Sequence, residues 1–519
     1  MAFYQEFKNH LEADIPALYV ETTEWMRFQN EFKQCSEALN KKYFFWNPLE
    51  GIVKTGDTKE GEEHKDPIEL LNFIKNENEN SIFILEFFDR QFEDADVHRM
   101  FSIMLRSLRD NKNQVIVVAP TLNLPNTLEK EFAILDFPLP DIKSIRAVLN
   151  QVKKDFKLQD GKVDDSGKVL DAVRGLGTTE IWNAFSKVAA YSKQITAEEI
   201  PQLIAEKEQI IRKSGYLEFI PTKESMSIVG GLDSLKKWLE DRKIAFGSEA
   251  RQMKLDAPKG VLLLGIPGTG KSLCAKVIAK EWEIPLLRLD MGRIFGGIVG
   301  ESETNMRNAI KTAESLEPCV LWIDEIEKGL SGGASSGGER DGGTSVRVFG
   351  SLLTWMQEKS KEVFVFATAN DVSKLPPELL RKGRFDEIFF VDLPDEKERK
   401  EIFNIHLKNK EQELEPTSEL LKDTEGFSGA EIEAIVKEAL FSAHSQNSDK
   451  TSIAIKVKNL KDAISEMMPL STTMYETITG LRKWAEHRCR LASNATPPKI
   501  KENKGVSLKQ EITNIFTKE

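Results

Sequence analysis

The chain alternates short apolar runs with longer segments whose apolar residues recur at helical spacing. In the first half, five β-rich runs occupy residues 17–21, 43–46, 81–87, 114–119 and 132–136. Helix-like segments lie between them, at 23–39, 67–75 and 97–109. Strands that alternate with helices are typical of βαβ units, so this half predicts an α/β domain with a parallel sheet.

The second half repeats this alternation and then changes. Its apolar runs occupy residues 261–264, 286–290, 319–324, 363–368 and 388–392. After Pro394 the pattern is helical to about residue 491, which predicts a C-terminal helical lid domain. A charged helical stretch at 200–214 and a short connector at 216–222 separate the two halves, and an amphipathic helix runs from Asp233 to Arg242.

An internal repeat relates the two halves. Residues 131–141 (EFAILDFPLPD) resemble residues 387–395 (EIFFVDLPD), and the helix start at 175–181 (GLGTTEI) resembles the one at 426–432 (GFSGAEI), at a similar spacing. We therefore predict that residues 1 to about 205 are a degenerate copy of the later module. The alternative is two unrelated α/β domains that share short apolar strands.

These patterns predict six segments. A degenerate α/β domain (1–140) is followed by its small helical lid (141–205) and a linker (206–227). A large α/β domain (228–395), a helical lid domain (396–493) and a polar tail (494–519) come next. The Gly/Ser-rich stretch at 331–344 is predicted to be a flexible loop.

Residues 265–272 match the pattern G-x-x-x-x-G-K-[ST] between a predicted strand and a predicted helix. Glycines let backbone N–H groups curl around a phosphate, and the helix N-terminus adds partial positive charge. Lys271 is expected to reach the β and γ phosphates, and Ser272 to hold Mg²⁺. The candidate nucleotide-binding residues of this loop are Pro267, Gly268, Thr269, Gly270, Lys271 and Ser272.

Polar residues end two of the later strands. The strand at 320–325 ends in two carboxylates, and we assign Asp324 to Mg²⁺ and Glu325 to the attacking water. Asn370 ends the strand at 363–370, where it is placed to hydrogen-bond the γ-phosphate or that water. Taken alone, the two carboxylates could simply end a strand, and Asn370 could be a turn residue. The phosphate loop upstream favours the catalytic interpretation.

Arg381 and Arg384 lie three residues apart beside a glycine. Such a pair can be an ordinary solvated turn. Phosphoryl transfer, however, requires positive charge on the transferring group, and an arginine from a neighbouring subunit can supply it. We therefore predict that both arginines act in trans on a neighbour's nucleotide.

The first half lacks these features. Its first strand is followed by residues 22–25 (TTEW), so a phosphate would meet Glu24 instead of a cradle of N–H groups. Its third strand ends without adjacent carboxylates, and the stretch at 124–131 has no arginine. We predict that this half binds no nucleotide.

Composition narrows the class of protein. The chain has 519 residues, 30% of them charged, and a net charge of −11, which does not favour a broad nucleic-acid-binding surface. Its four cysteines form no C-x-x-C pair, which argues against a disulfide scaffold or a zinc site. No stretch approaches the ~18 apolar residues of a membrane span, and the first ten residues lack the apolar core of a signal peptide.

These residues in this order resemble the AAA family of ATPases, classical clade. Lys271, Asp324, Glu325, Asn370 and the two arginines stand at that family's Walker A, Walker B, sensor and arginine-finger positions. Gly429 and Ala430 match its lid motif, and Val229 and Gly230 match its adenine-side segment. Residues 295–303 and 469–493 and the inert first copy resemble the subgroup found in cyanobacteria and encoded in algal plastids.

The resemblance implies ATP and Mg²⁺ as ligands, a homo-oligomer (a hexamer), a protein partner of unknown identity and a location in the cytoplasm or plastid stroma. Family unfoldases place an aromatic residue in a central-pore loop. Here that position holds residues 298–300 (IVG), with Phe295 three residues earlier. Threading of a polypeptide is therefore not implied.

Two functions follow from these observations, and a third is weaker. The first is a ring-forming Mg-ATPase that remodels a protein partner. The second is a nucleotide-gated binding or assembly module with slow hydrolysis, which the absent pore aromatic and the inert first copy favour. A nucleic-acid motor is the weaker third, because the net charge is acidic.

Overall fold

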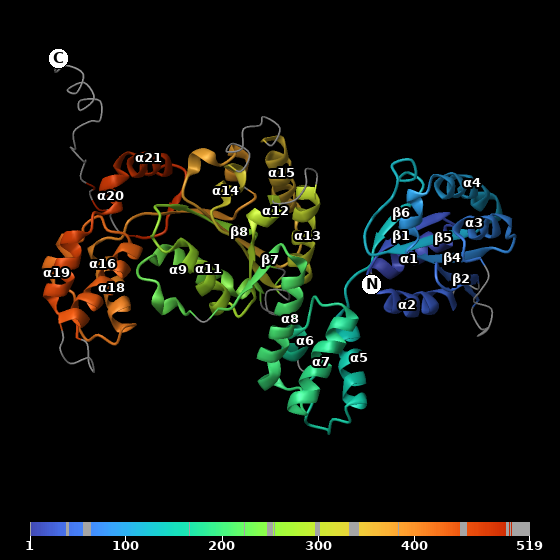
Figure 1. Ribbon diagram of the computed structural model, residues 1–519, viewed down its shortest axis with the longest axis horizontal. Helices are drawn as coiled ribbons and strands as arrows, with labels where there is room; N and C mark the ends of the chain where they lie inside the picture. Colours follow the sequence, from blue (N-terminus) through green and yellow to red (C-terminus); the bar gives the residue numbers. More distant parts are fainter. Residues whose placement is uncertain are drawn as a thin grey trace, which may run out of the picture. The chain divides into compact units, whose positions relative to one another are not determined.

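The computed structural model describes residues 2–37, 41–54, 64–165, 167–222, 224–246, 253, 255–295, 301–331, 342–381, 383–446, 454–494, 498 and 500. The chain divides into two compact units, Met1–Ile204 and Ala205–Glu519. Figure 1 colours them from blue to green and from green to red. Within the described residues, no helix has both the length and the apolar character needed to cross a membrane.

The first unit contains a six-stranded sheet in the order β3-β2-β4-β5-β1-β6 (Figure 1). The strands are β1 (Ala17–Glu21), β2 (Lys42–Asn47), β3 (Gly51–Lys54), β4 (Ser81–Glu86), β5 (Gln114–Ala119) and β6 (Ala133–Asp136). All neighbouring pairs are parallel except β2–β3, which is antiparallel. Every residue of β5 is buried, as expected for a central strand covered on both faces.

Helices cover both faces of this sheet. On one face, α1 (Ala2–Glu12) and α2 (Trp25–Glu37) pack a phenylalanine-rich core that includes Phe7, Phe28 and Phe32. On the other, α3 (Pro67–Asn76) and α4 (Ala95–Asn111) bury Leu70 and Phe101. The unit continues with α5 (Ile142–Asp155), α6 (Gly167–Ala172) and α7 (Thr178–Ser192), and α8 (Ile200–Ser214) spans the division between the units.

The second unit contains a seven-stranded sheet in the order β13-β12-β8-β11-β10-β9-β7. The strands are β7 (Leu217–Ile220), β8 (Gly260–Gly265), β9 (Leu286–Leu289), β10 (Cys319–Ile323), β11 (Val363–Ala369), β12 (Glu387–Val391) and β13 (Arg490–Leu491). β7 runs antiparallel to β9, and the other pairs are parallel.

Helices α9 (Asp233–Lys243) and α11 (Lys271–Glu281) pack on one face of this sheet, through Trp238 and Val277 among others. Helices α13 (Glu301–Ser315) and α15 (Gly342–Glu358) pack on the other face. A separate helical core then follows, made by α16 (Glu396–Lys408), α17 (Ser418–Asp423), α18 (Gly429–Gln446) and α19 (Val457–Glu466). This arrangement matches the predicted α/β module with a helical lid.

The chain returns to the sheet after the lid. Helices α20 (Leu470–Thr473) and α21 (Tyr475–Ala485) lead to β13, and Leu481 of α21 packs on Phe390 of β12. The Arg482 guanidinium makes an ion pair of 2.7 Å with Asp392, just beyond β12. The C-terminal segment therefore lies beside the end of β12, where the sheet carries its polar residues.

The two sheets share one strand order. Five strands of each sheet can be compared when the edge strands β3, β7 and β13 are left out and the rest are numbered 1 to 5 along the chain. Both sheets then have the order 5-1-4-3-2, as β6-β1-β5-β4-β2 in the first and β12-β8-β11-β10-β9 in the second. Unrelated α/β domains would share this order only by chance. The topology therefore supports the degenerate first copy that the sequence repeat predicts.

Three edge strands were not predicted. β3 follows a short turn, β7 lies in the stretch interpreted as a connector, and β13 lies where helix was expected. They are two to four residues long, so they carry no periodicity, and they form only because a neighbouring strand offers free edge groups. The predicted pore-loop residues 298–300, most of the Gly/Ser-rich loop and nearly all of the tail lie outside the described residues.

Candidate functional site

The predicted phosphate loop connects β8 to α11. Gly268 and Gly270 have φ angles of +77° and +87°, a region that side chains disfavour. Gly265 has φ +152°, and a Cβ there would lie 2.0 Å from the Val391 carbonyl oxygen. α11 begins at Lys271 without a side-chain cap on its first turn, so its leading N–H groups are available to an anion.

Lys271 lies inside this loop, with 6% of its surface exposed. Its ammonium donates to the carbonyl oxygens of Gly265 (3.0 Å) and Ile266 (2.7 Å). Burial lowers the pKa of Lys271 to about 8, against the opposing effect of nearby carboxylates, Glu327 first. The side chain therefore remains mainly protonated at pH 7 and is positioned for a phosphate group.

Asp324, just beyond β10, faces Ser272 in the first turn of α11. Its Oδ1 accepts hydrogen bonds from the hydroxyls of Ser272 (2.8 Å) and Thr368 (2.6 Å). A carboxylate and a hydroxyl beside a phosphate loop are the oxygen donors that Mg²⁺ takes, with substrate phosphates and water completing its shell. The residues present thus fit the predicted metal.

Glu325 and Asn370 meet directly. The Asn370 side-chain amide donates to Glu325 Oε1 at 2.9 Å, and Lys328 makes an ion pair with the same carboxylate. Glu325 has φ +49°, in the left-handed region, which costs of the order of 1–3 kcal/mol for a residue with a side chain. Its backbone N–H donates to Thr368 Oγ1 at 2.9 Å, which holds that conformation.

Two residues of this network were not predicted. Thr368 joins Asp324 to Glu325, and Glu327 Oε1 accepts the Asn370 backbone N–H at 2.9 Å. Burial raises the pKa of Glu327, although the Asn370 N–H and Lys271 oppose that shift. Thr368 lies inside a strand and Glu327 inside a helix start, so neither belongs to a sequence motif, and only the folded chain brings them to the site.

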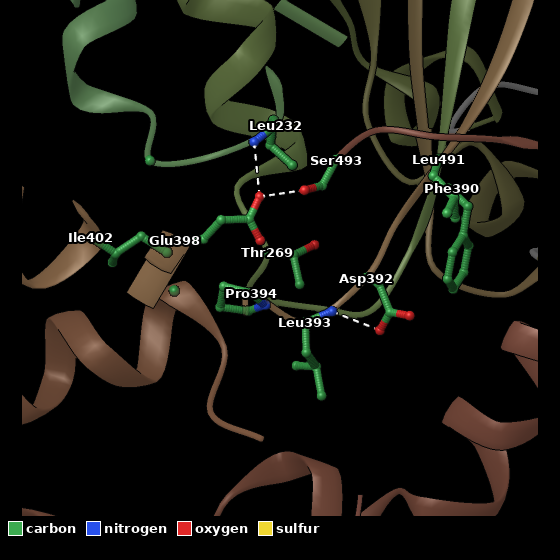
Figure 2. A pocket seen from close by; sticks show the side chains of 12 residues that line it. Leu232, Thr269, Phe390, Asp392, Leu393, Pro394, Glu398, Ile402, Leu491 and Ser493 are labelled. Atoms are coloured by element: carbon green, nitrogen blue, oxygen red, sulfur yellow. Dashed lines mark hydrogen bonds between the residues drawn. The ribbon is translucent and has the colours of Figure 1, made fainter. Parts of the chain in front are cut away.

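A partly open pocket extends from Thr269 along the adenine-side segment. Gly230, Ile402 and Gly429 line it, together with the C-terminal residues Leu491 and Ser493. Figure 2 shows Glu398 in its wall, accepting hydrogen bonds from the Leu232 N–H (3.2 Å) and the Ser493 hydroxyl (2.6 Å). Val229 is buried beside this pocket, and its carbonyl accepts from Lys236.

The lid helix α18 contacts the phosphate loop. The Ala430 N–H donates to the Gly268 carbonyl at 2.9 Å, and a Cβ at Gly429 would lie 3.4 Å from the same oxygen. A Cβ at Gly268 would lie 3.0 Å from the Ser428 hydroxyl. The structure therefore brings Gly429 and Ala430 to the loop, next to the pocket that Gly230 lines.

The two arginines lie apart from this network. Arg381 is exposed and Arg384 half-buried, in the segment before β12. The Arg384 guanidinium donates to the Glu378 carbonyl, which also accepts the Arg381 N–H. The action of both arginines on a neighbouring subunit therefore stays a prediction.

The chain is similar over nearly its whole length to known proteins. An uncharacterized AAA domain-containing protein, ycf46, of Guillardia theta is 38% identical over 506 residues, covering 95% of this chain and 97% of the relative. The ycf46 protein of Pyropia yezoensis is 37% identical over 504 residues, with 95% and 100% coverage. The chain belongs to the AAA family of ATPases, in the ycf46 group.

Family models divide this AAA protein along its length. The model described as "ATPase family associated with various cellular activities (AAA)" matches residues 261–393, and an AAA+ lid model matches residues 417–456. The N-terminal and second domains of SpoVK-like AAA ATPases match residues 3–137 and 143–214. A cell division cycle protein 48 homolog of Archaeoglobus fulgidus is 29% identical over 406 residues, 70% of this chain and 54% of the relative. Both modules are therefore AAA-like.

Proposed function

We propose that this AAA protein is a Mg²⁺-dependent ATPase that works as a ring-shaped homo-oligomer and remodels a protein partner. One observation carries the proposal. The hydrogen-bond network from Ser272 through Asp324 and Thr368 to Glu325 and Asn370 lies beside the uncapped start of α11. The groups proposed to hold the metal and to polarise the water thus lie at the carboxyl ends of adjacent parallel strands.

ATP binding follows from the loop and pocket. The phosphates would take the N–H groups of residues 267–272 and the Lys271 ammonium, which would exchange its carbonyl partners for phosphate oxygens. The base would enter the pocket beside Val229 and Gly230, with Gly429 and Ala430 near the ribose. Mg²⁺, held by Ser272 and Asp324, would neutralise developing charge on the phosphates.

Hydrolysis needs a water held in line with the γ-phosphate. The Glu325 carboxylate is the acceptor placed to polarise that water, and the Asn370 amide, 2.9 Å from Glu325 Oε1, orients the carboxylate. Arg381 and Arg384 would stabilise the transferring phosphoryl group on a neighbouring subunit. The site is then complete only at an interface between two copies, for which a hexameric ring is the expected arrangement.

The structure offers a route from hydrolysis to movement. Helix α14 (Ile326–Ser331) begins directly after Glu325 and packs against α12 (Met291–Phe295), so closely that a Cβ at Gly329 would lie 2.6 Å from Met291 Cε. Phe295 also lines an open cleft with Asp324 and Glu325. A shift of Glu325 would therefore reach the segment that precedes the predicted pore loop.

For domain organisation we infer the division at 1–140, 141–205, 206–227, 228–395, 396–493 and 494–519, with cytoplasm or plastid stroma as the place of action.

A second function is a nucleotide-gated binding module with slow hydrolysis. The ion pair between Glu24 and Arg27 favours this second function, because the first unit then needs no nucleotide of its own. Partner-stimulated hydrolysis would favour the remodeller, and nucleotide-dependent co-purification without stimulation the gated module.

A mixing experiment tests the proposed function. Arg381→Ala and Lys271→Ala proteins should each lose most hydrolysis, and the arginine change alone should cost roughly 10³-fold. Mixed in equal amounts, they should regain activity. In such a ring about one interface in four joins an intact loop to an intact arginine, since head-to-tail interfaces use two different surfaces. Phosphate release measures the outcome.

The matched control is Arg99→Ala, which removes an exposed arginine from α4 in the first unit and should leave hydrolysis unchanged. If ATP hydrolysis does not recover at any mixing ratio, although both variants are folded and oligomeric, catalysis in trans is contradicted. Absence of ATP hydrolysis by the unmodified protein, alone and with cell extract, would contradict the ATPase proposal itself.

A further inference from the structure

Thr368 lies near the end of β11. Its side chain is 1% exposed and lies next to the carboxyl end of β10, whose Ile323 pairs with Ala367. Its hydroxyl group both donates and accepts a hydrogen bond there. It donates to Asp324 Oδ1 at 2.6 Å and accepts the Glu325 N–H at 2.9 Å.

These two bonds act on the two carboxylates that the proposed reaction needs. The bond to Asp324 adds to the one from Ser272 on the same oxygen and limits rotation of the carboxylate plane. The bond from the Glu325 N–H holds that residue in a left-handed conformation, which turns the chain sharply into α14. A hydroxyl can donate and accept at once from one atom, whereas valine of the same shape can do neither.

We propose that Thr368 is a positioning residue that orients Asp324 toward the metal and Glu325 toward the water through a single hydroxyl group. The inference rests on the proposed function, because it assigns roles within that reaction. It adds a residue that touches neither substrate nor metal. Its effect should therefore appear in metal affinity and turnover and be absent from metal-free nucleotide binding.

The test compares Thr368→Val, which keeps the shape, with Thr368→Ser, which keeps the hydroxyl. A fluorescent ADP analogue is titrated first in EDTA and then with MgCl₂, and phosphate release is measured separately. Thr368→Val should raise the Mg²⁺ concentration for half-maximal response by about 10-fold and lower kcat by about 10–100-fold. Its metal-free nucleotide affinity should stay within about twofold of the unmodified protein, and Thr368→Ser should behave like that protein.

Different failures are distinguishable. Equal Mg²⁺ response and kcat in Thr368→Val and the unmodified protein would overturn the inference while the proposed function stands. Equal damage in the serine and valine variants would assign Thr368 to packing alone. If the unmodified protein shows no Mg²⁺-dependent nucleotide binding, the proposed function itself fails. Should Thr368→Val not fold, Thr368→Ala takes its place against the same serine control.

A second, independent observation concerns Glu24 in the first unit. It follows β1, where the second unit has its phosphate loop, and it precedes α2 as that loop precedes α11. Glu24 Oε2 lies 2.6 Å from Arg27 Nε, with 9% and 11% of the two side chains exposed. Arg27 also donates to the Pro138 carbonyl and stacks 4.2 Å above the Phe137 ring.

The same carboxylate reaches the start of a lid helix. Glu24 accepts the Thr178 N–H at the first residue of α7, and a Cβ at Gly177 would lie 3.0 Å from Glu24 Oε1. A helix N-terminus favours an anion. α7 corresponds by the sequence repeat to α18, which approaches the phosphate loop of the second unit. In the first unit the chain thus supplies its own anion at this place.

We infer that the Glu24 carboxylate substitutes for a nucleotide phosphate and holds the sheet and lid helix of the first unit together without any ligand. In the second unit the corresponding lid contact runs directly from the Ala430 N–H to the Gly268 carbonyl, whereas in the first unit a buried carboxylate makes it. Arg27 compensates the buried charge, which otherwise would be costly.

Hydrogen exchange in the full-length chain tests this inference. Glu24→Ala should speed exchange of the amides at 178–181 by at least about 10-fold, and 20 mM inorganic phosphate should partly reverse the change. Glu69→Ala, which removes an exposed acidic residue from the first turn of α3, is the matched control and should leave these amides unchanged. Unchanged exchange in Glu24→Ala would overturn the inference. So would nucleotide binding to the first unit of the Lys271→Ala protein.

Discussion

Replacement of Lys271 by alanine is expected to weaken ATP binding by at least about 100-fold. The ammonium is buried in the phosphate loop and remains mainly protonated at pH 7, so it would make charge-assisted hydrogen bonds with two phosphate groups. Such bonds contribute about 1.5–3 kcal/mol each, and about 2.7 kcal/mol corresponds to a factor of 100. Titration with a fluorescent ATP analogue measures the loss.

Two controls separate binding from folding in this experiment. Lys280→Ala removes an exposed lysine from the last turn of the same helix and should bind ATP normally. Lys271→Met keeps the apolar stem of the side chain, so it limits the cavity while removing the charge. ATP binding within about threefold of the unmodified protein, in folded Lys271 variants, would exclude this loop as the phosphate site.

The Glu325→Gln protein is expected to bind ATP normally and to hydrolyse it roughly 10³-fold more slowly. Glutamine keeps the shape of the side chain and can still contact Asn370, but it cannot accept a proton from water. Loss of a general base typically costs 10²–10⁴-fold. Because ATP then persists at the interface, light scattering should show a closed oligomer with ATP-Mg that is absent without nucleotide.

The control for this change is Glu358→Gln, at the exposed end of α15, which should leave turnover and mass unchanged. Normal turnover in Glu325→Gln would remove Glu325 from the proposed role. A monomer under all nucleotide conditions would leave Arg381 and Arg384 without a neighbour to act on. The nucleotide-gated module would then be the better proposal, or a partner would be needed for assembly.

The central strands of both sheets could be predicted from the sequence because they are buried on both faces. β8 and β10 are continuous apolar runs, β11 is interrupted only by Thr368, and all residues of the three strands are buried. Such runs are visible without any knowledge of neighbours. The phosphate loop was equally visible, since its glycines, lysine and serine are consecutive. The degenerate first copy was predicted from two short repeats, and the shared strand order supports it.

The C-terminal segment shows where local pattern fails. Residues 490–491 were expected to end a helical region, yet they form β13 alongside β12. Two residues carry no pattern of their own, and their conformation depends on an edge strand about a hundred residues earlier in the chain. This pairing in turn places Ser493 against Glu398 in the wall of the pocket.

The sequence by itself therefore determined which residues we propose for phosphate and metal binding, because contiguous motifs and buried strands encode them locally. Only the tertiary structure decided which groups orient them. Thr368 of β11 bonds to Asp324 at the end of the adjacent strand β10, Glu327 holds the Asn370 backbone, and Glu24 meets the start of α7 more than 150 positions away. Such contacts depend on hydrogen-bond distances of a few ångströms, which residue spacing along the chain does not specify.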